Sequence, residues 1–228
     1  MDGWLPPVLL SLRIALVATT AVFFLGTAAA WMLVKRRPPG GRLLDVLFTL
    51  PLVLPPTVIG FLLLWLLGRH GPLGRLLHLV GVEILFTWWA GVVASAVVSF
   101  PLMYNAAKAG LEGVDENLEK AARTLGASEV RIFFTITLPL AWPGLGTGLV
   151  LSFVRALGEF GATLMLAGNI PGRTQTVATA VWAATETGDA RTATRLVGLM
   201  LALGFASVWA SRLGSEWGFG RYLRARRG

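Results

Sequence analysis

The chain has 228 residues, of which 55% are hydrophobic and 14% are charged, and its mean hydropathy is +0.68. This composition excludes an ordinary soluble domain and is typical of a protein that lies in a bilayer. The net charge of +8 does not indicate nucleic-acid binding, because basic residues that alternate with long apolar runs are better explained by orientation in a membrane.

The apolar runs predict five membrane spans. They cover residues 9–34, 44–67, 84–107, 143–166 and 192–212. A hydrocarbon core of about 30 Å requires roughly 20 helical residues, which these runs supply or nearly supply. The first run is not a cleavable signal peptide, because it lacks the positive start and the short apolar core of one. Residues 68–83 are expected to form a loop, and the short apolar segment 174–187 to form a helix in the outer half of the bundle.

The second span contains Pro51, Pro55 and Pro56. Each proline removes a backbone donor and clashes with the preceding turn, so we expect this helix to be kinked or broken near the middle of the membrane. Irregular backbone at that depth is tolerated only where protein or a water-filled cavity surrounds it. The break is therefore either a bend in a packing helix or part of a transport pathway.

A polar segment, residues 120–139, lies between the third and fourth spans and has the pattern of two helices that meet at a corner. Asp115 is expected to cap the first helix and Gly126 to end it in the left-handed conformation. Ser128 then provides a cap for the second helix. Small alanine side chains on the first helix would let its backbone lie close to another protein, which suits docking into a groove.

The same segment resembles the signature of the membrane subunits of bacterial ABC importers, which begins with Glu-Ala-Ala and ends with Leu-Pro. The matching positions are Ala121, Ala122, Gly126, Ile136, Leu138 and Pro139. Lys120 stands where the family prefers glutamate, and Glu119 precedes it. The resemblance implies that residues 108–138 couple the chain to a separate ATPase. The expected contact residues are Glu119, Lys120, Ala121, Ala122, Leu125 and Gly126. The alternative is an ordinary amphipathic cytoplasmic hairpin.

The basic residues predict the orientation of the chain. With the N-terminus outside, thirteen Lys and Arg residues lie on the cytoplasmic side and five outside. This distribution follows the positive-inside rule, and it places the C-terminus and the 108–138 loop in the cytoplasm. We therefore expect an all-α membrane protein with the type I ABC importer fold, as one transmembrane domain over residues 1–228 with its core at 9–212, in the bacterial cytoplasmic membrane.

The resemblance also implies partners. They are a second copy of the chain, two cytoplasmic ATPase subunits that bind ATP-Mg, and a periplasmic or extracellular oxyanion-binding protein. No cofactor, metal or nucleic acid is expected on this chain. It has no GxxxxGK[ST] phosphate loop, no hydrolytic motif and no cysteine, so we expect a transport subunit rather than an enzyme.

Residues 155–176, with the sequence RALGEFGATLMLAGNIPGRTQT, resemble a segment shared by molybdate, tungstate and sulfate permeases. Together with FPLM at 100–103, LEGVD at 111–115 and AARTLGAS at 121–128, they resemble the molybdate permease subunit family most closely. Tungstate and sulfate or thiosulfate remain alternatives within this group. A stand-alone secondary transporter or channel is the alternative from another class, but only Glu159 offers it an intramembrane carboxylate.

Arg155 and Glu159 are the charged residues expected inside the fourth span. A helix that starts near Pro143 would place them about 18 and 24 Å along its axis, on one face, where each can neutralise the other. They form either an ion pair that only holds the helices in place or a site that helps an oxyanion cross the low-dielectric part of the pathway. Further candidates to line the pathway are Pro55, Pro56, Thr57, Ser95, Ser99, Ser152 and Thr163. Ser95 and Ser99 can equally well hold helices together.

Overall fold

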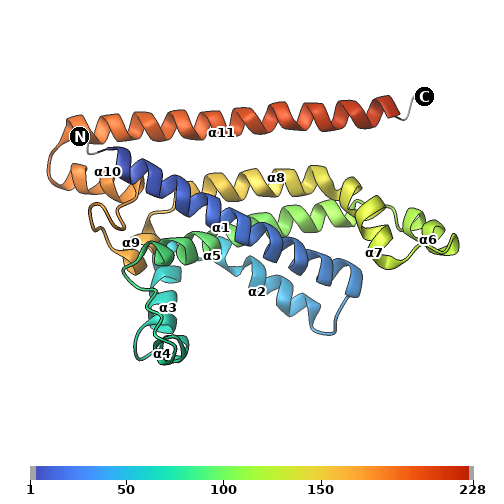
Figure 1. Cartoon of the computed structure of the whole chain (residues 1–228), viewed down its shortest axis with the longest axis horizontal. Helices are drawn as coiled ribbons and strands as arrows, with labels where there is room; N and C mark the ends of the chain where they lie inside the picture. Colours follow the sequence, from blue (N-terminus) through green and yellow to red (C-terminus); the bar gives the residue numbers. More distant parts are fainter. Residues whose placement is uncertain (1–3, 226–228) are drawn as a thin grey trace.

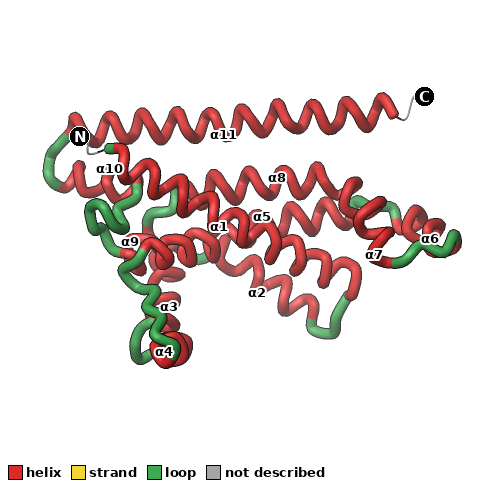
Figure 2. The backbone as a smooth tube through the Cα atoms, in the orientation of Figure 1, coloured by secondary structure: helices red, strands yellow, loops and turns green. Residues whose placement is uncertain are grey.

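A computed structural model describes the backbone of residues 4–225 and the side chains of residues 4–209. The ordered elements of this part of the chain are helices joined by loops (Figure 2). They are α1 (Leu5–Trp31), η1 (Met32–Arg36), α2 (Gly41–Val53), α3 (Pro56–Leu67), α4 (Pro72–Leu79), α5 (Trp88–Glu112), α6 (Glu116–Thr124), α7 (Glu129–Ile132), η2 (Phe133–Thr137), α8 (Leu138–Leu157), α9 (Gly161–Ala167), α10 (Val177–Glu186) and α11 (Ala190–Ala225).

Helices α1, α5 and α8 make the most extensive contacts with one another and form the centre of the bundle (Figure 1). Small residues allow the close approach of α5 to α8. A Cβ atom added to Gly144 would lie 2.7 Å from the Cα atom of Gly110. Because lipid is as apolar as the side chains, helices in a bilayer associate through such close packing rather than through the hydrophobic effect.

Within the described residues, four helices are long and apolar enough to cross a membrane, and a fifth span is present if the bent pair α2 and α3 counts as one. The two helices of this pair meet at an angle of 116°. The prediction of a broken second helix is confirmed, and the break lies at Leu54 and Pro55. The first helical stretch runs over residues 5–36 and the third over 88–112, so both differ from the predicted limits by a few residues.

The predicted fourth span, residues 143–166, is wrong at both ends. Its helical stretch begins at Glu129 and ends at Leu157, and Pro143 lies inside α8 rather than at its start. The π turns of η2 precede Pro139 and accommodate the backbone where prolines remove donors. Residues 161–167 form the separate helix α9.

Two connecting segments were predicted with different success. Residues 68–83 are not simply a loop, because they contain the helix α4, which begins at Pro72. The segment 174–187 contains the short helix α10, as predicted. Helix α11 lies against α8 and α10 on the surface of the bundle (Figure 1). Among the basic residues of the C-terminal tail, Arg226 and Arg227 lie outside the described residues.

Candidate functional site

The polar corner between α6 and α7 has the geometry that its sequence predicts. The Asp115 carboxylate accepts a hydrogen bond of 2.9 Å from the backbone N–H of Asn117. The Ser128 hydroxyl accepts one of 3.3 Å from the N–H of Arg131. Gly126 has a φ of +81°, which ordinary side chains rarely adopt. We call residues 115–132 the docking hairpin. It protrudes from one end of the bundle (Figure 1).

The tip of the docking hairpin carries an exposed apolar side chain. Leu125 is 88% exposed and Leu118 is 48% exposed, although the helix around them is polar. Lys120 and Ala121 are also exposed, and Ala122 is half-buried. A large apolar side chain on a polar protrusion has no neighbour to cover it within the described chain. The tip is therefore a candidate contact surface for another protein.

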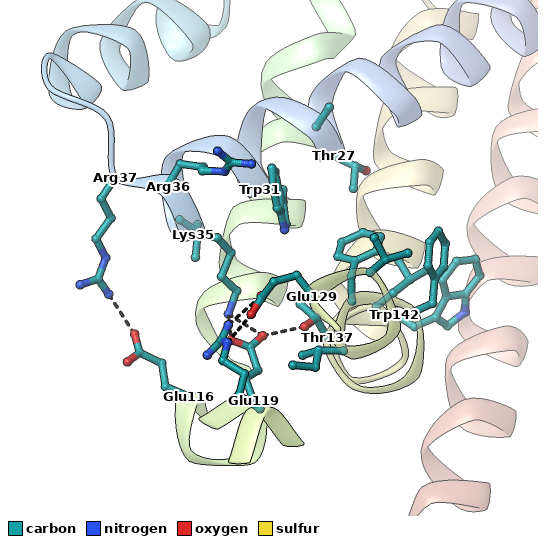
Figure 3. Close-up of a pocket in the computed structure, with 18 of the residues that line it drawn as sticks. Thr27, Trp31, Lys35, Arg36, Arg37, Glu116, Glu119, Glu129, Thr137 and Trp142 are labelled. Atoms are coloured by element: carbon teal, nitrogen blue, oxygen red, sulfur yellow. Dashed lines mark hydrogen bonds and ion pairs between the residues drawn. The ribbon is translucent and has the colours of Figure 1, made fainter. Parts of the chain in front are cut away.

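Glu119 differs from the other expected contact residues because it faces into the molecule. It is 4% exposed, and its carboxylate lies 2.9 Å from Lys35 Nζ. The Thr137 hydroxyl donates a hydrogen bond of 2.6 Å to the same carboxylate. Figure 3 shows how Lys35 of η1 and Thr137 of η2 converge on Glu119 of α6. Sequence reasoning missed Lys35 and Thr137, which no motif connects to Glu119.

These contacts set the protonation of Glu119. Burial by itself raises the pKa of this carboxyl, but the hydrogen bond from Thr137 and the bond and charge of Lys35 outweigh burial. The net pKa of Glu119 is therefore lowered from the ordinary value of 4.5. The carboxylate is ionised at neutral pH and joins the docking hairpin to α1, through η1, and to the start of α8.

A second candidate site lies where two broken helices meet. A Cβ atom added to Gly161, at the start of α9, would lie 3.2 Å from Pro56 at the start of α3. The break between α2 and α3 therefore touches the break between α8 and α9. Pro55 and Thr57 are exposed there, and Pro56 is half-buried.

Arg155 and Glu159 form the predicted ion pair, with 2.8 Å between Arg155 Nη1 and Glu159 Oε2. The side chain of Glu159 is 1% exposed and that of Arg155 is 31% exposed. The expectation that both lie on one continuous helix is wrong, because α8 ends at Leu157. Glu159 lies in the break, and its Oε1 accepts a hydrogen bond of 2.8 Å from the backbone N–H of Ala162 in α9.

The serine candidates are buried between α5 and α8. Ser152 donates a hydrogen bond of 3.3 Å to the carbonyl of Ser99, and Ser95 donates one of 3.4 Å to the carbonyl of Ala156. These bonds join two helices, which agrees with the interhelical role. The hydroxyl of Thr163 on α9 is buried without a hydrogen-bond partner among the described residues.

The corner of the docking hairpin gives a first test. If the hairpin docks to an ATPase, as the sequence resemblance implies, Gly126→Val is expected to weaken that binding by about tenfold, because a side chain at positive φ costs roughly 1–2 kcal/mol and a β-branched one more. Space is not the limit, since a Cβ atom there would meet nothing within 4 Å. Gly126→Asn is the matched control, because asparagine tolerates this conformation. The amount of ATPase that copurifies with each variant measures docking. An equal loss of copurified ATPase in both variants would contradict the explanation by the backbone conformation of Gly126.

The fold and the two sites define a class, a helical membrane protein with a polar hairpin exposed at one end. Comparison with known proteins agrees with this class. Residues 22–213 match the family described as "Binding-protein-dependent transport system inner membrane component". The chain belongs to this family of inner-membrane components, whose members work with ATPase and substrate-binding proteins.

Two individual relatives and one solved structure illustrate the similarity. The chain is 48% identical over 215 residues to the molybdenum transport system permease protein ModB of Escherichia coli K12, covering 92% of this chain and 94% of the relative. It is 50% identical over 185 residues to the putative molybdenum transport system permease protein YvgM of Bacillus subtilis, covering 80% and 81%. Among solved structures, a MetNI methionine ABC transporter in an inward-facing conformation matches with a TM-score of 0.74 and 18% identity, over 96% of this chain and 97% of that chain. The last comparison supports the type I importer fold alone.

Proposed function

We propose that the chain is the membrane-spanning subunit of an ATP-driven importer for molybdate. The observation that carries this proposal is the docking hairpin, which ends a bundle of apolar helices with an exposed apolar tip at Leu125. The choice of molybdate as the substrate rests on the sequence identity of 48% and 50% to two molybdenum transport permeases. ATP-Mg is bound by the partner ATPase, and this chain transmits the resulting movement to the pathway.

The orientation follows from charge. With the N-terminus outside, the docking hairpin lies in the cytoplasm, where an ATPase can reach it. The ATPase contacts are Lys120, Ala121, Ala122 and Leu125, with Gly126 setting the corner. Glu119 acts from behind them by holding α6 against the bundle. A binding protein outside delivers the oxyanion.

Two copies of the chain form the pathway. Irregular backbone at membrane depth must be covered by protein or water, because lipid cannot bond to its free polar groups. Pro55 and Thr57 lie at such a break and are exposed in the single chain. A second copy, related by twofold symmetry, would cover both breaks and enclose a path between them.

The homodimer is directly testable by mass. Native mass spectrometry of the solubilised complex is expected to give two copies of this chain and two ATPase subunits, because one chain supplies one docking hairpin. Dissociation of the ATPase in detergent should leave a dimer. A complex that holds a single copy of this chain would contradict the proposal.

Docking can be tested by crosslinking. Because the chain has no cysteine, Leu125→Cys introduces a single reactive site. It is expected to crosslink to a cysteine introduced in the ATPase groove and to lose the crosslink when the ATPase is omitted. Thr135→Cys, which is exposed on η2 outside the docking tip, is the matched control. Failure of every single cysteine from Leu118 to Leu125 to crosslink would contradict docking at this hairpin.

The substrate is tested by ATPase activity of the complex reconstituted with its binding protein. We expect molybdate to stimulate hydrolysis at lower concentration than sulfate or thiosulfate, with tungstate as the nearest competitor because of its similar charge and shape. If sulfate alone stimulates ATP hydrolysis, the chain is a sulfate permease subunit rather than a molybdate one. Oxyanion uptake without ATP would instead support a stand-alone transporter.

A further inference from the structure

A large groove lies between the end of α1 and the docking hairpin, at the end of the bundle from which the hairpin protrudes. Its volume is about 1150 Å³, and its walls come from α1, η1, α6, α7, η2 and α8. Figure 3 shows aromatic side chains along one part of the groove and charged side chains at the other. We propose that this groove binds one anionic phospholipid, with the phosphate at the charged rim and an acyl chain along the aromatic wall.

The rim carries an excess of positive charge. Among the lining residues there are five lysines and arginines but three glutamates. The three carboxylates take part in four ion pairs: Lys35 with Glu119, Arg37 and Lys120 with Glu116, and Arg123 with Glu129. In the part of the chain with described side chains, Arg36 has no carboxylate within ion-pair distance. Its guanidinium lies 5.3 Å from the ring centre of Trp31.

Arg36 is therefore available to an anion. Arginine offers a planar set of donors that matches phosphate oxygens, and tryptophan is favoured at the level of lipid headgroups. Basic pockets between transmembrane helices at the cytoplasmic surface are a known setting for anionic headgroups. The rim thus has both the charge and the position that a lipid phosphate requires.

The apolar wall has the length of one leaflet. Phe24 lies twelve residues before Arg36 on the continuous α1 and η1 stretch, which corresponds to about 18 Å of helix. Half of the hydrocarbon core is about 15 Å thick, so the wall reaches from the headgroup level to the middle of the bilayer. Phe24, Phe134 and Trp142 on this wall are 66%, 61% and 52% exposed, and an acyl chain would cover them.

A second copy of the chain fits the groove less well. Two such grooves placed against each other would bring two positive rims together, which is unfavourable. A zwitterionic lipid would fill the apolar part but would not balance the charge at Arg36. An anionic phospholipid satisfies both parts. The placement of the rim at the cytoplasmic surface rests on the orientation proposed above.

The test is titration of the delipidated, full-length chain in detergent with dioleoylphosphatidylglycerol or dioleoylphosphatidylcholine, followed by native mass spectrometry. We expect one tightly bound phosphatidylglycerol for each chain and weaker binding of phosphatidylcholine. Arg36→Gln is expected to reduce the preference for phosphatidylglycerol by about fivefold, which is the effect of one basic residue near an anionic lipid. Arg42→Gln is the matched control, because Arg42 lies in the same basic segment but does not line this groove.

A second variant tests the apolar wall. Ala28 is exposed on α1 within the groove, and Ala28→Trp should displace the acyl chain and weaken both lipids. If Arg36→Gln and Arg42→Gln reduce the preference for phosphatidylglycerol equally, the proposal is overturned in favour of diffuse electrostatic attraction. Equal affinity of the wild type for the two lipids would overturn it as well. A crosslink from Ala28→Cys to another copy of the chain would assign the groove to a protein contact instead. Because the titration contains no ATP, ATPase or oxyanion, its outcome is independent of the transport assays.

Discussion

Replacing Glu119 by leucine is expected to destabilise the connection between the docking hairpin and the bundle by about 3 kcal/mol, because the half-buried Lys35 then loses its counter-charge. For a chain of this size, that change corresponds to a fall in Tm of roughly 10 °C. The coupling of ATP hydrolysis to oxyanion uptake should fall as well, since Glu119 joins α6 to both α1 and α8. Thermal unfolding of the solubilised dimer and the ratio of transport to hydrolysis measure the two effects.

The matched control restores the balance of charge. In the double variant Lys35→Met with Glu119→Leu, no charge remains buried, so most of the stability should return. Glu119→Gln keeps an acceptor for the Thr137 hydroxyl and is expected to lie between the wild type and Glu119→Leu. A Tm of Glu119→Leu equal to that of the wild type would mean that these three residues do not hold the hairpin.

The same contacts predict a pH dependence. Because the pKa of Glu119 is lowered in the folded state, its stabilisation is fully present above the ordinary pKa of 4.5. It is lost as the pH falls through the lowered pKa, below 4.5. The difference in Tm between the wild type and Glu119→Gln should therefore be constant near neutral pH and should shrink only in this acid range.

The corner of the docking hairpin could be predicted from the sequence because its geometry is local. Asp115, Gly126 and Ser128 each act within a few residues of their own position, through side-chain caps and a backbone conformation. The break in the second helix was predictable for the same reason, since Pro55 disrupts its own turn. Apolar length similarly predicted the four long apolar helices of the described chain and the bent pair α2 and α3.

The features that sequence reasoning missed depend on distant contacts or on interruptions that do not change hydrophobicity. Lys35 and Glu119 are 84 positions apart, and no local pattern connects them. The apolar run through α8 and α9 continues past Leu157, so hydrophobicity averaged over a window of residues does not reveal the break. Gly158 and Gly161, on either side of Glu159, were the available signal for a break.

Arg155 and Glu159 lie at this break, and their geometry favours a structural role. Arg155 is in the last turn of α8, where a cation is favourable, and Glu159 accepts from the start of α9. Arg155→Met is expected to prevent assembly or to cost about 3–5 kcal/mol, because Glu159 then remains buried without its counter-charge. The double variant Arg155→Met with Glu159→Gln should assemble, since the neutral amide still offers an oxygen to the N–H of Ala162.

Transport by this double variant separates the two roles of the pair. If Arg155 only neutralises Glu159, the variant should assemble, hydrolyse ATP in response to molybdate and import it at close to the wild-type rate. If Arg155 carries the oxyanion across the low-dielectric part of the pathway, the variant should assemble and hydrolyse ATP but import none. We expect the first result, because each oxygen of the Glu159 carboxylate already has a partner in the folded chain, the charge of Arg155 at Oε2 and the N–H of Ala162 at Oε1. Uptake of labelled molybdate into vesicles that contain the complex, measured together with phosphate release, distinguishes the outcomes, and hydrolysis without uptake would assign Arg155 to the pathway.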